Sequence, residues 1–131
     1  MSLATVQTRA LCALNATQVS VEVHLSQGLP AFHLVGLPEV SVKEAKERVR
    51  SAIINSHFDF PACRITINLA PADLPKDGGR YDLAIALGIL SASDQIPTEH
   101  LADFEFIAEL GLAGNTLPVN GIVQWSLVPS N

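Results

Sequence analysis

The sequence has few cysteines, few aromatic residues and no long apolar run. Its two cysteines, Cys12 and Cys63, stand in strand-like segments without close metal-ligand spacing. Such residues are typical of small buried side chains in a reducing compartment. No stretch of about 20 apolar residues could span a bilayer, and no basic region followed by an apolar run marks the amino terminus. We therefore expect a cytoplasmic protein with no membrane partner.

Positive charge is also scarce. Eight lysines and arginines against 13 acidic residues give a net charge of −5. A protein that grips phosphate backbones by itself usually carries a basic patch, so a stand-alone nucleic-acid-binding module is disfavoured and kept as an alternative. The cations cluster only within residues 43–50, where glutamates are interleaved with them. We interpret that run as a solvated helix face.

The sequence does contain ample material for one core. Its 131 residues are 48% hydrophobic, and a chain of this length buries roughly two-thirds of the surface that its unfolded form exposes. We expect one domain over residues 1–122, followed by a tail over residues 123–131 where the pattern fades.

Alternation of apolar and polar residues predicts strands over about residues 4–14, 17–26 and 31–35. We expect these three strands to pair in antiparallel order. A tight turn over residues 27–30 would then place His24 opposite His33. Two exposed histidines without a carboxylate or thiol beside them are a weak metal signal, and we expect no metal site.

The remaining pattern predicts two helices, a fourth strand and a hairpin. Ser41 and Glu44 have the spacing of a capping box, so a helix is expected from there to about His57. Residues 64–69 alternate as a strand. Asp82 then caps a second helix that is apolar all round. Residues 104–112 and 116–119, joined by a Gly-Asn turn, predict a further strand pair.

The loop before the second helix is the most informative segment. Lys76, Gly78 and Gly79 precede a helix start, where backbone N–H groups can cradle a phosphate. The chain lacks the Gly-Lys-Ser/Thr signature of a nucleotide-hydrolase loop. The alternative is that the two glycines serve the turn itself. No serine of the chain stands in a nucleophile-elbow motif.

Three segments carry a resemblance to a known family. They are Gly36-Leu37-Pro38-Glu39, the run Val42-Lys43-Glu44-Ala45-Lys46-Glu47-Arg48-Val49, and the run from Ile67 to Leu83 that includes Pro75-Lys76-Asp77-Gly78-Gly79-Arg80. Over about residues 3–122 the chain resembles the amino-terminal domain of the ComM/YifB family, bacterial magnesium-chelatase-like AAA+ proteins.

The resemblance implies a fold shared with the proteolytic domain of Lon protease, with GHMP kinases and with the second domain of a small-subunit ribosomal protein. That is an α+β fold of two layers, with a mixed, mostly antiparallel sheet and two main helices on one face. The resemblance also implies a parent protein that continues into an ATPase module. ATP and magnesium would bind there, and no cofactor is expected in this chain.

The implied parent is a hexameric, ATP-driven helicase that promotes branch migration of DNA in natural transformation. Its partners, by the same resemblance, are the chain's own carboxy-terminal AAA+ module, further copies of itself and DNA.

Comparison with Lon-type proteases makes the central loop a test for catalysis. Those proteases carry a similar Pro-Lys-Asp-Gly run, with the catalytic serine two residues after the glycine. That position is Arg80 here, and the position of the catalytic lysine falls at Val123. Neither side chain can act as nucleophile or base in such a dyad. We expect no catalytic residue in this chain. A Lon-like hydrolase or a small phosphate-ester enzyme remains the alternative.

The candidate contact residues, for DNA or for neighbouring subunits, are five cations. A guanidinium beside two glycines could reach a phosphate or a carboxylate, which makes Arg80 the first choice. An equally open alternative is that Arg80 pairs with Asp77 or Asp82 in its own loop. The full set of candidates is Lys43, Lys46, Arg50, Lys76 and Arg80.

Overall fold

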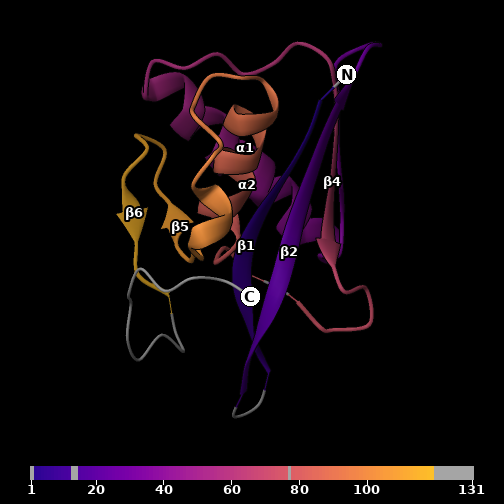
Figure 1. Ribbon diagram of the computed structural model, residues 1–131, viewed down its shortest axis with the longest axis vertical. Helices are drawn as coiled ribbons and strands as arrows, with labels where there is room; N and C mark the ends of the chain where they lie inside the picture. The colour runs from indigo at the N-terminus through magenta and orange to yellow at the C-terminus, as the bar shows by residue number, and fades with distance from the viewer. Residues whose placement is uncertain (1, 13–14, 77, 120–131) are drawn as a thin grey trace.

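The chain is an α+β domain in which two helices cover one face of a mixed sheet (Figure 1). The structure, a computed structural model, describes residues 2–12, 15–76 and 78–119. The four-stranded sheet has the order β1-β2-β4-β3, and a two-stranded sheet pairs β5 with β6. The elements are β1 (Ser2–Cys12), β2 (Asn15–Ser26), β3 (Ala31–Val35), α1 (Glu39–Asn55), β4 (Arg64–Ala70), α2 (Asp82–Ala92), the 3-10 helix η1 (Leu101–Asp103), β5 (Glu109–Leu110) and β6 (Thr116–Leu117).

The core lies between the sheet and the two helices. Successive side chains of a strand point to opposite faces. The buried positions of each strand fall on the face that the helices cover. In β2 this face is formed by Val19, Val21 and Val23, all fully buried. The other face of the sheet is polar and partly exposed. The predicted architecture, a mixed sheet with two helices on one face, is confirmed.

The two helices bury different amounts of their surface. In α1 the buried residues Ala45, Val49, Ala52 and Ile53 form one stripe, as the sequence predicts. In α2 nearly every residue is buried, because the helix packs across β1 and β2 and also against α1. Gly88 makes the close approach to β2 possible: a Cβ there would lie 2.6 Å from Val23 Cγ2. No described helix is both long and apolar enough to cross a membrane.

The predicted pairing of the third strand was wrong. β1 and β2 are antiparallel, but β3 pairs in parallel with β4 at the edge of the sheet and makes no ladder with β2. A crossover connection of a dozen or more residues is required between parallel neighbours, and α1 supplies it. His24 and His33 therefore both align with Thr66, from strands on opposite sides of β4.

The predicted start of α1 was also wrong. The helix begins at Glu39, with Pro38 as its N-cap residue, and no side chain caps it. Ser41 thus lies inside the first turn. Proline suits this position because its ring fixes φ at a value compatible with helix entry, here −59°. Its carbonyl accepts the N–H of Val42 at 3.0 Å. The helix ends at Asn55, before His57, which has a φ of 69°.

The predicted hairpin is present but short. β5 and β6 pair antiparallel, with Gly114 in the turn at a φ of 93°. Residues 104–106 form no ladder with it. They run along the outer edge of β1, where the N–H of Phe106 donates to the Gln7 carbonyl at 2.9 Å. The boundary expected at residue 122 lies outside the described residues, as does the predicted tail.

Candidate functional site

The central loop is built around the side chain of Lys76. Its ammonium donates to the carbonyl oxygens of Pro71 at 2.6 Å and Leu74 at 2.7 Å. The residue is only 8% exposed. A buried ammonium group requires hydrogen-bond acceptors, and here two carbonyl oxygens of the same loop accept from it. This burial leaves the ammonium of Lys76 little access for the predicted contact with DNA or a neighbouring subunit.

A buried ion pair joins α1 to the first residue of α2. Arg48 Nε donates to Asp82 Oδ2 at 2.6 Å, and Arg48 Nη2 lies 3.3 Å from Asp82 Oδ1. Asp82 is 1% exposed and also accepts the N–H of Leu110 at 3.2 Å. Its carboxylate thus holds both helices and β5 together. The sequence predicted Asp82 as a helix cap, but the N-cap is Tyr81 and no side chain caps α2.

The electrostatics of this pair are dominated by burial. Desolvation raises the pKa of the Asp82 carboxyl above its ordinary value, while the hydrogen bonds from Arg48 and from the Leu110 N–H work against that rise. The hydrogen bond with Asp82 raises the pKa of Arg48, so this guanidinium is a permanent charge. These hydrogen bonds join α1 to the first residue of α2.

The two glycines of the loop differ in their roles. Gly78 has a φ of +79°, and the space around it is open. Glycine adopts this conformation without strain. At Gly79 the limit is packing: a Cβ would lie 2.8 Å from Glu109 Oε1 and 3.0 Å from Arg48 Nη2. The interpretation of these glycines as turn residues fits this geometry.

Arg80 lies at the point where the loop meets β1. Its Nε donates to the Arg9 carbonyl at 3.0 Å, and Arg9 in turn pairs with Glu105 at 2.6 Å. The alternative that Arg80 pairs with Asp82 is not what the structure shows, because Asp82 is taken by Arg48. Asp77 and Val123 lie outside the described residues.

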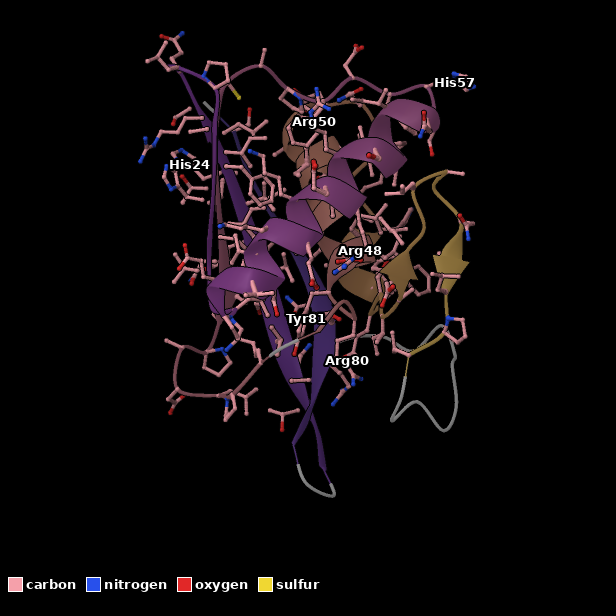
Figure 2. All side chains as sticks on the ribbon, turned by 180° about the vertical axis from the view of Figure 1, so that it is seen from behind. His24, Arg48, Arg50, His57, Arg80 and Tyr81 are labelled. Atoms are coloured by element: carbon pink, nitrogen blue, oxygen red, sulfur yellow. The ribbon has the colours of Figure 1, made fainter. Side chains whose placement is uncertain are left out.

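The predicted basic face of α1 is divided by the structure into two flanks. Figure 2 shows Arg48 on the flank toward the β5–β6 hairpin and Arg50 on the opposite flank. Lys43, Lys46 and Arg50 recur at three- and four-residue intervals, which places them on one side of a helix. Arg48 is two residues from both Lys46 and Arg50, and this offset is the signal in the sequence that could have separated it from them.

A hollow of about 310 Å³ lies beside Lys46 and Arg50. The Arg50 guanidinium carbon stands 5.8 Å from the centre of the Phe60 ring. This separation is within the range of a cation–π contact. No ion pair among the described residues involves Lys43, Lys46 or Arg50. The other residues that line the hollow are Pro30, Ala31, Phe32, Ile54, Pro61, Ala62 and Cys63.

The remaining candidates lie apart from this flank. His24 lies on the side of the sheet away from the helices (Figure 2), and no group of three or more metal-ligating side chains occurs among the described residues. Cys63 is free and partly buried beside the hollow, while the side chain of Cys12 is outside what the structure describes. The structure thus brings Lys46 and Arg50 together and leaves Lys76 and Arg80 elsewhere.

Comparisons with known proteins match most of this chain. Residues 21–129 match the family described as subunit ChlI of Mg-chelatase. The chain is 60% identical over 123 residues to Competence protein ComM of Haemophilus influenzae, covering 94% of this chain and 24% of that protein. It is 57% identical over 124 residues to uncharacterized protein YifB of Salmonella typhimurium, and 56% identical to that of Escherichia coli, each covering 95% of this chain and 24% of the relative. The chain thus spans about a quarter of the length of these relatives.

Proposed function

Because the chain belongs to the ChlI family of magnesium-chelatase subunits and corresponds to the amino-terminal domain of its ComM/YifB members, we propose that it is a non-catalytic domain of an ATP-driven DNA-processing motor. ATP and magnesium would bind to an AAA+ module of the parent, outside this chain. The domain would act through contacts with that module, with neighbouring subunits and with DNA.

The proposal that the domain is non-catalytic is supported by one observation: the charged side chains in and beside the central loop are hydrogen-bonded within the domain. Lys76 is bonded to two carbonyls, Asp82 to Arg48, and Arg80 to the Arg9 carbonyl. A catalytic group needs a partner that activates it and room for substrate. Here each of these charged groups is engaged in holding the loop, α2 and β1 in place.

The part concerning DNA is supported by the relative's printed name, Competence protein ComM, and by its 60% identity to this chain. The acidic net charge of −5 argues that DNA binding by the parent does not depend on this domain as a whole. Lys43, Lys46, Arg50 and Arg80 remain the residues proposed for contacts.

The test compares this chain with the full-length parent. ATP hydrolysis, peptide hydrolysis and branch migration on a four-way DNA junction are measured for both. We expect the parent to hydrolyse ATP and move junctions, and this chain to do neither and to cleave no peptide.

Two substitutions sharpen the test. Arg80→Ser places a hydroxyl at the position of the Lon-type nucleophile and is expected to produce no peptidase activity, because the lysine position is Val123. Arg80→Ala in the parent is expected to leave ATP turnover within about twofold, since each tenfold loss requires removing about 1.4 kcal/mol of transition-state stabilisation. Peptide cleavage by the unmodified chain, abolished by changing one serine, would contradict the proposal.

A further inference from the structure

Within residues 2–12, 15–76 and 78–119, two edges of the sheet present backbone that pairs with no further strand. β3 is an edge strand along its whole length, and β1 is free of any described strand from Ser2 to Thr5. The Ala31 N–H bonds to the Cys63 carbonyl on the β4 side at 3.3 Å. Because backbone groups alternate in direction along a strand, the N–H and C=O groups of Phe32 and Leu34 point outward. Exposed edges of this kind are ready-made templates for pairing with another chain.

The backbone groups of β1 that point outward can be identified in the same way. The Phe106 N–H donates to the Gln7 carbonyl on the outer side of β1, at 2.9 Å. Backbone groups on one strand alternate in direction, so those of Leu3 and Thr5 also point outward. Each edge therefore offers two residues with matching spacing.

The β3 edge is flanked by the lysines and arginines that have no polar partner among the described residues. Four other cations are engaged inside the domain: Arg48 with Asp82, Arg9 with Glu105, and Lys76 and Arg80 with backbone carbonyls. The remaining four make neither an ion pair nor a side-chain hydrogen bond among the described residues. They lie on α1 or at the start of β4, next to β3, and are Lys43, Lys46, Arg50 and Arg64. Glu39 and Glu47 on the exposed side of α1 oppose them only in part.

The flank at β1 carries the opposite charge. A hollow of about 380 Å³ lies beside the first residues of β1, and Asp94 is part of its lining. Glu99 is exposed nearby in the chain, and Asp103 of η1 is exposed and pairs with His100 at 3.2 Å. Lys43, Lys46 and Arg50 lie on α1, and Asp94 follows the end of α2, so most of the charge at both edges lies beside the helix layer.

Exposed apolar side chains accompany both edges. Leu29 is 88% exposed just before β3, Val35 is 56% exposed at its end, and Val40 is 69% exposed at the start of α1. On β1, Leu3 is 71% exposed. Apolar groups at a free edge favour a protein partner over a polyanion such as DNA.

We propose that copies of this chain associate head to tail, with the β3 edge of one copy pairing with the β1 edge of the next. β1 and β3 both run parallel to β4, since β2 is antiparallel to each of its neighbours and β3 is parallel to β4. Two copies in the same orientation thus form a parallel β3–β1 pair with their helix layers on one side. Lys46 and Arg50 of one copy then face Asp94 and Glu99 of the next.

A heterologous contact of this kind closes into a ring or continues as a filament. It would supply the subunit contacts of the proposed function, and it rests on that function only for its setting in a ring. The association is measured on this chain without ATP or DNA, so its failure is distinct from a failure of the motor assignment.

The test is sedimentation equilibrium of the 131-residue chain over a range of protein concentration, at low and high salt. The range runs from about 10 μM to about 1 mM, where weak specific contacts are measurable. The unmodified chain is expected to grow in average mass with concentration, and less at high salt. A basic-edge variant, Lys46→Glu with Arg50→Glu, and an acidic-edge variant, Asp94→Lys with Glu99→Lys, are each expected to associate at least about tenfold more weakly.

Mixing the two variants gives the decisive result. Each variant has two edges of like charge, and the two variants carry opposite signs, so both edge contacts between unlike variants are complementary. The mixture is therefore expected to regain the concentration-dependent growth of the unmodified chain. Glu22→Lys, on the open face of β2, changes the charge away from both edges and is the control expected to associate like the unmodified chain. Circular dichroism of each variant checks that it is folded.

Three results would overturn the inference. The first is an unmodified chain that stays monomeric throughout the range, which would assign the basic flank to another partner. The second is a pair of variants that associate as well as the unmodified chain. The third is a mixture of the two variants that associates no better than either variant alone, because complementary charges at the two edges would then not hold the copies together.

Discussion

Arg48 of α1 holds the buried carboxylate of Asp82, the first residue of α2, with 2.6 Å between Nε and Oδ2. The same carboxylate oxygen accepts the N–H of Leu110 in β5. Three elements thus converge on one side chain that is 1% exposed. The pair fixes how the central loop enters α2, and its removal should be felt in the stability of the whole domain.

Removing one partner of this pair should destabilise the domain strongly. For Asp82→Asn we expect a loss of about 1–3 kcal/mol in the free energy of unfolding. The amide keeps one acceptor oxygen where the carboxylate has two, so a donor of Arg48 or Leu110 loses its partner. The apolar double variant Arg48→Met with Asp82→Leu should lose less than Asp82→Asn alone. Urea unfolding measures both.

The control for this pair is Glu44→Gln. It removes a contact of 3.7 Å to Arg48 from an exposed carboxylate. Exposed ion pairs contribute little, so the expected change in the free energy of unfolding is below about 0.5 kcal/mol. A loss as large as that of Asp82→Asn would contradict the special role given to the buried carboxylate.

The pH dependence of stability should carry the signature of a buried carboxyl. Burial raises the pKa of folded Asp82 above its ordinary 3.8. The folded state therefore binds more protons than the unfolded chain between the two values, and stabilisation from this group declines as the pH rises through that interval. The stability difference between the unmodified chain and Asp82→Asn should shrink with rising pH and then become constant. A difference that grows with pH would show that Arg48 outweighs burial.

Gly88→Ala should destabilise the domain although alanine favours helices. The added Cβ would lie 2.6 Å from Val23 Cγ2 and 3.4 Å from Val23 Cβ, and a buried β-branched side chain has little freedom to move aside. We expect a net loss of about 1–2 kcal/mol by thermal or urea unfolding. The double variant Gly88→Ala with Val23→Ala removes the clash, so its effect should fall short of the sum of the two single changes.

Lys76 and Lys46 should respond differently to the same substitution. Lys76→Met leaves the carbonyls of Pro71 and Leu74 without their donor. We expect a loss of about 1–3 kcal/mol in the free energy of unfolding. Lys46→Met removes a cation that makes no ion pair among the described residues. Its stability should change by less than about 0.5 kcal/mol. Equal losses for the two variants would contradict the structural role given to Lys76.

Local patterns predicted most elements of the fold. The alternation in β2 and β4, the apolar stripe of α1 and the buried character of α2 follow from side-chain periodicity, which a single segment displays by itself. The capping predictions were wrong because each helix begins earlier in the chain than the predicted capping residue allows. Pro38 and Tyr81 take the N-cap positions, and in neither helix does a side chain cap the start.

What the sequence alone determined about this protein is its fold class, the one-sided burial of α1, the nearly complete burial of α2 and the family to which the central loop points. Only the tertiary structure decided the partner of β3, the burial of Lys76 and the pairing of Arg48 with Asp82. The physical reason is sequence distance: these features depend on contacts between residues such as 48 and 82, or strands such as β3 and β4, that chain neighbours do not encode. A run of charged residues has the same sequence pattern whether its side chains face solvent, a buried carboxylate or the edge of a sheet.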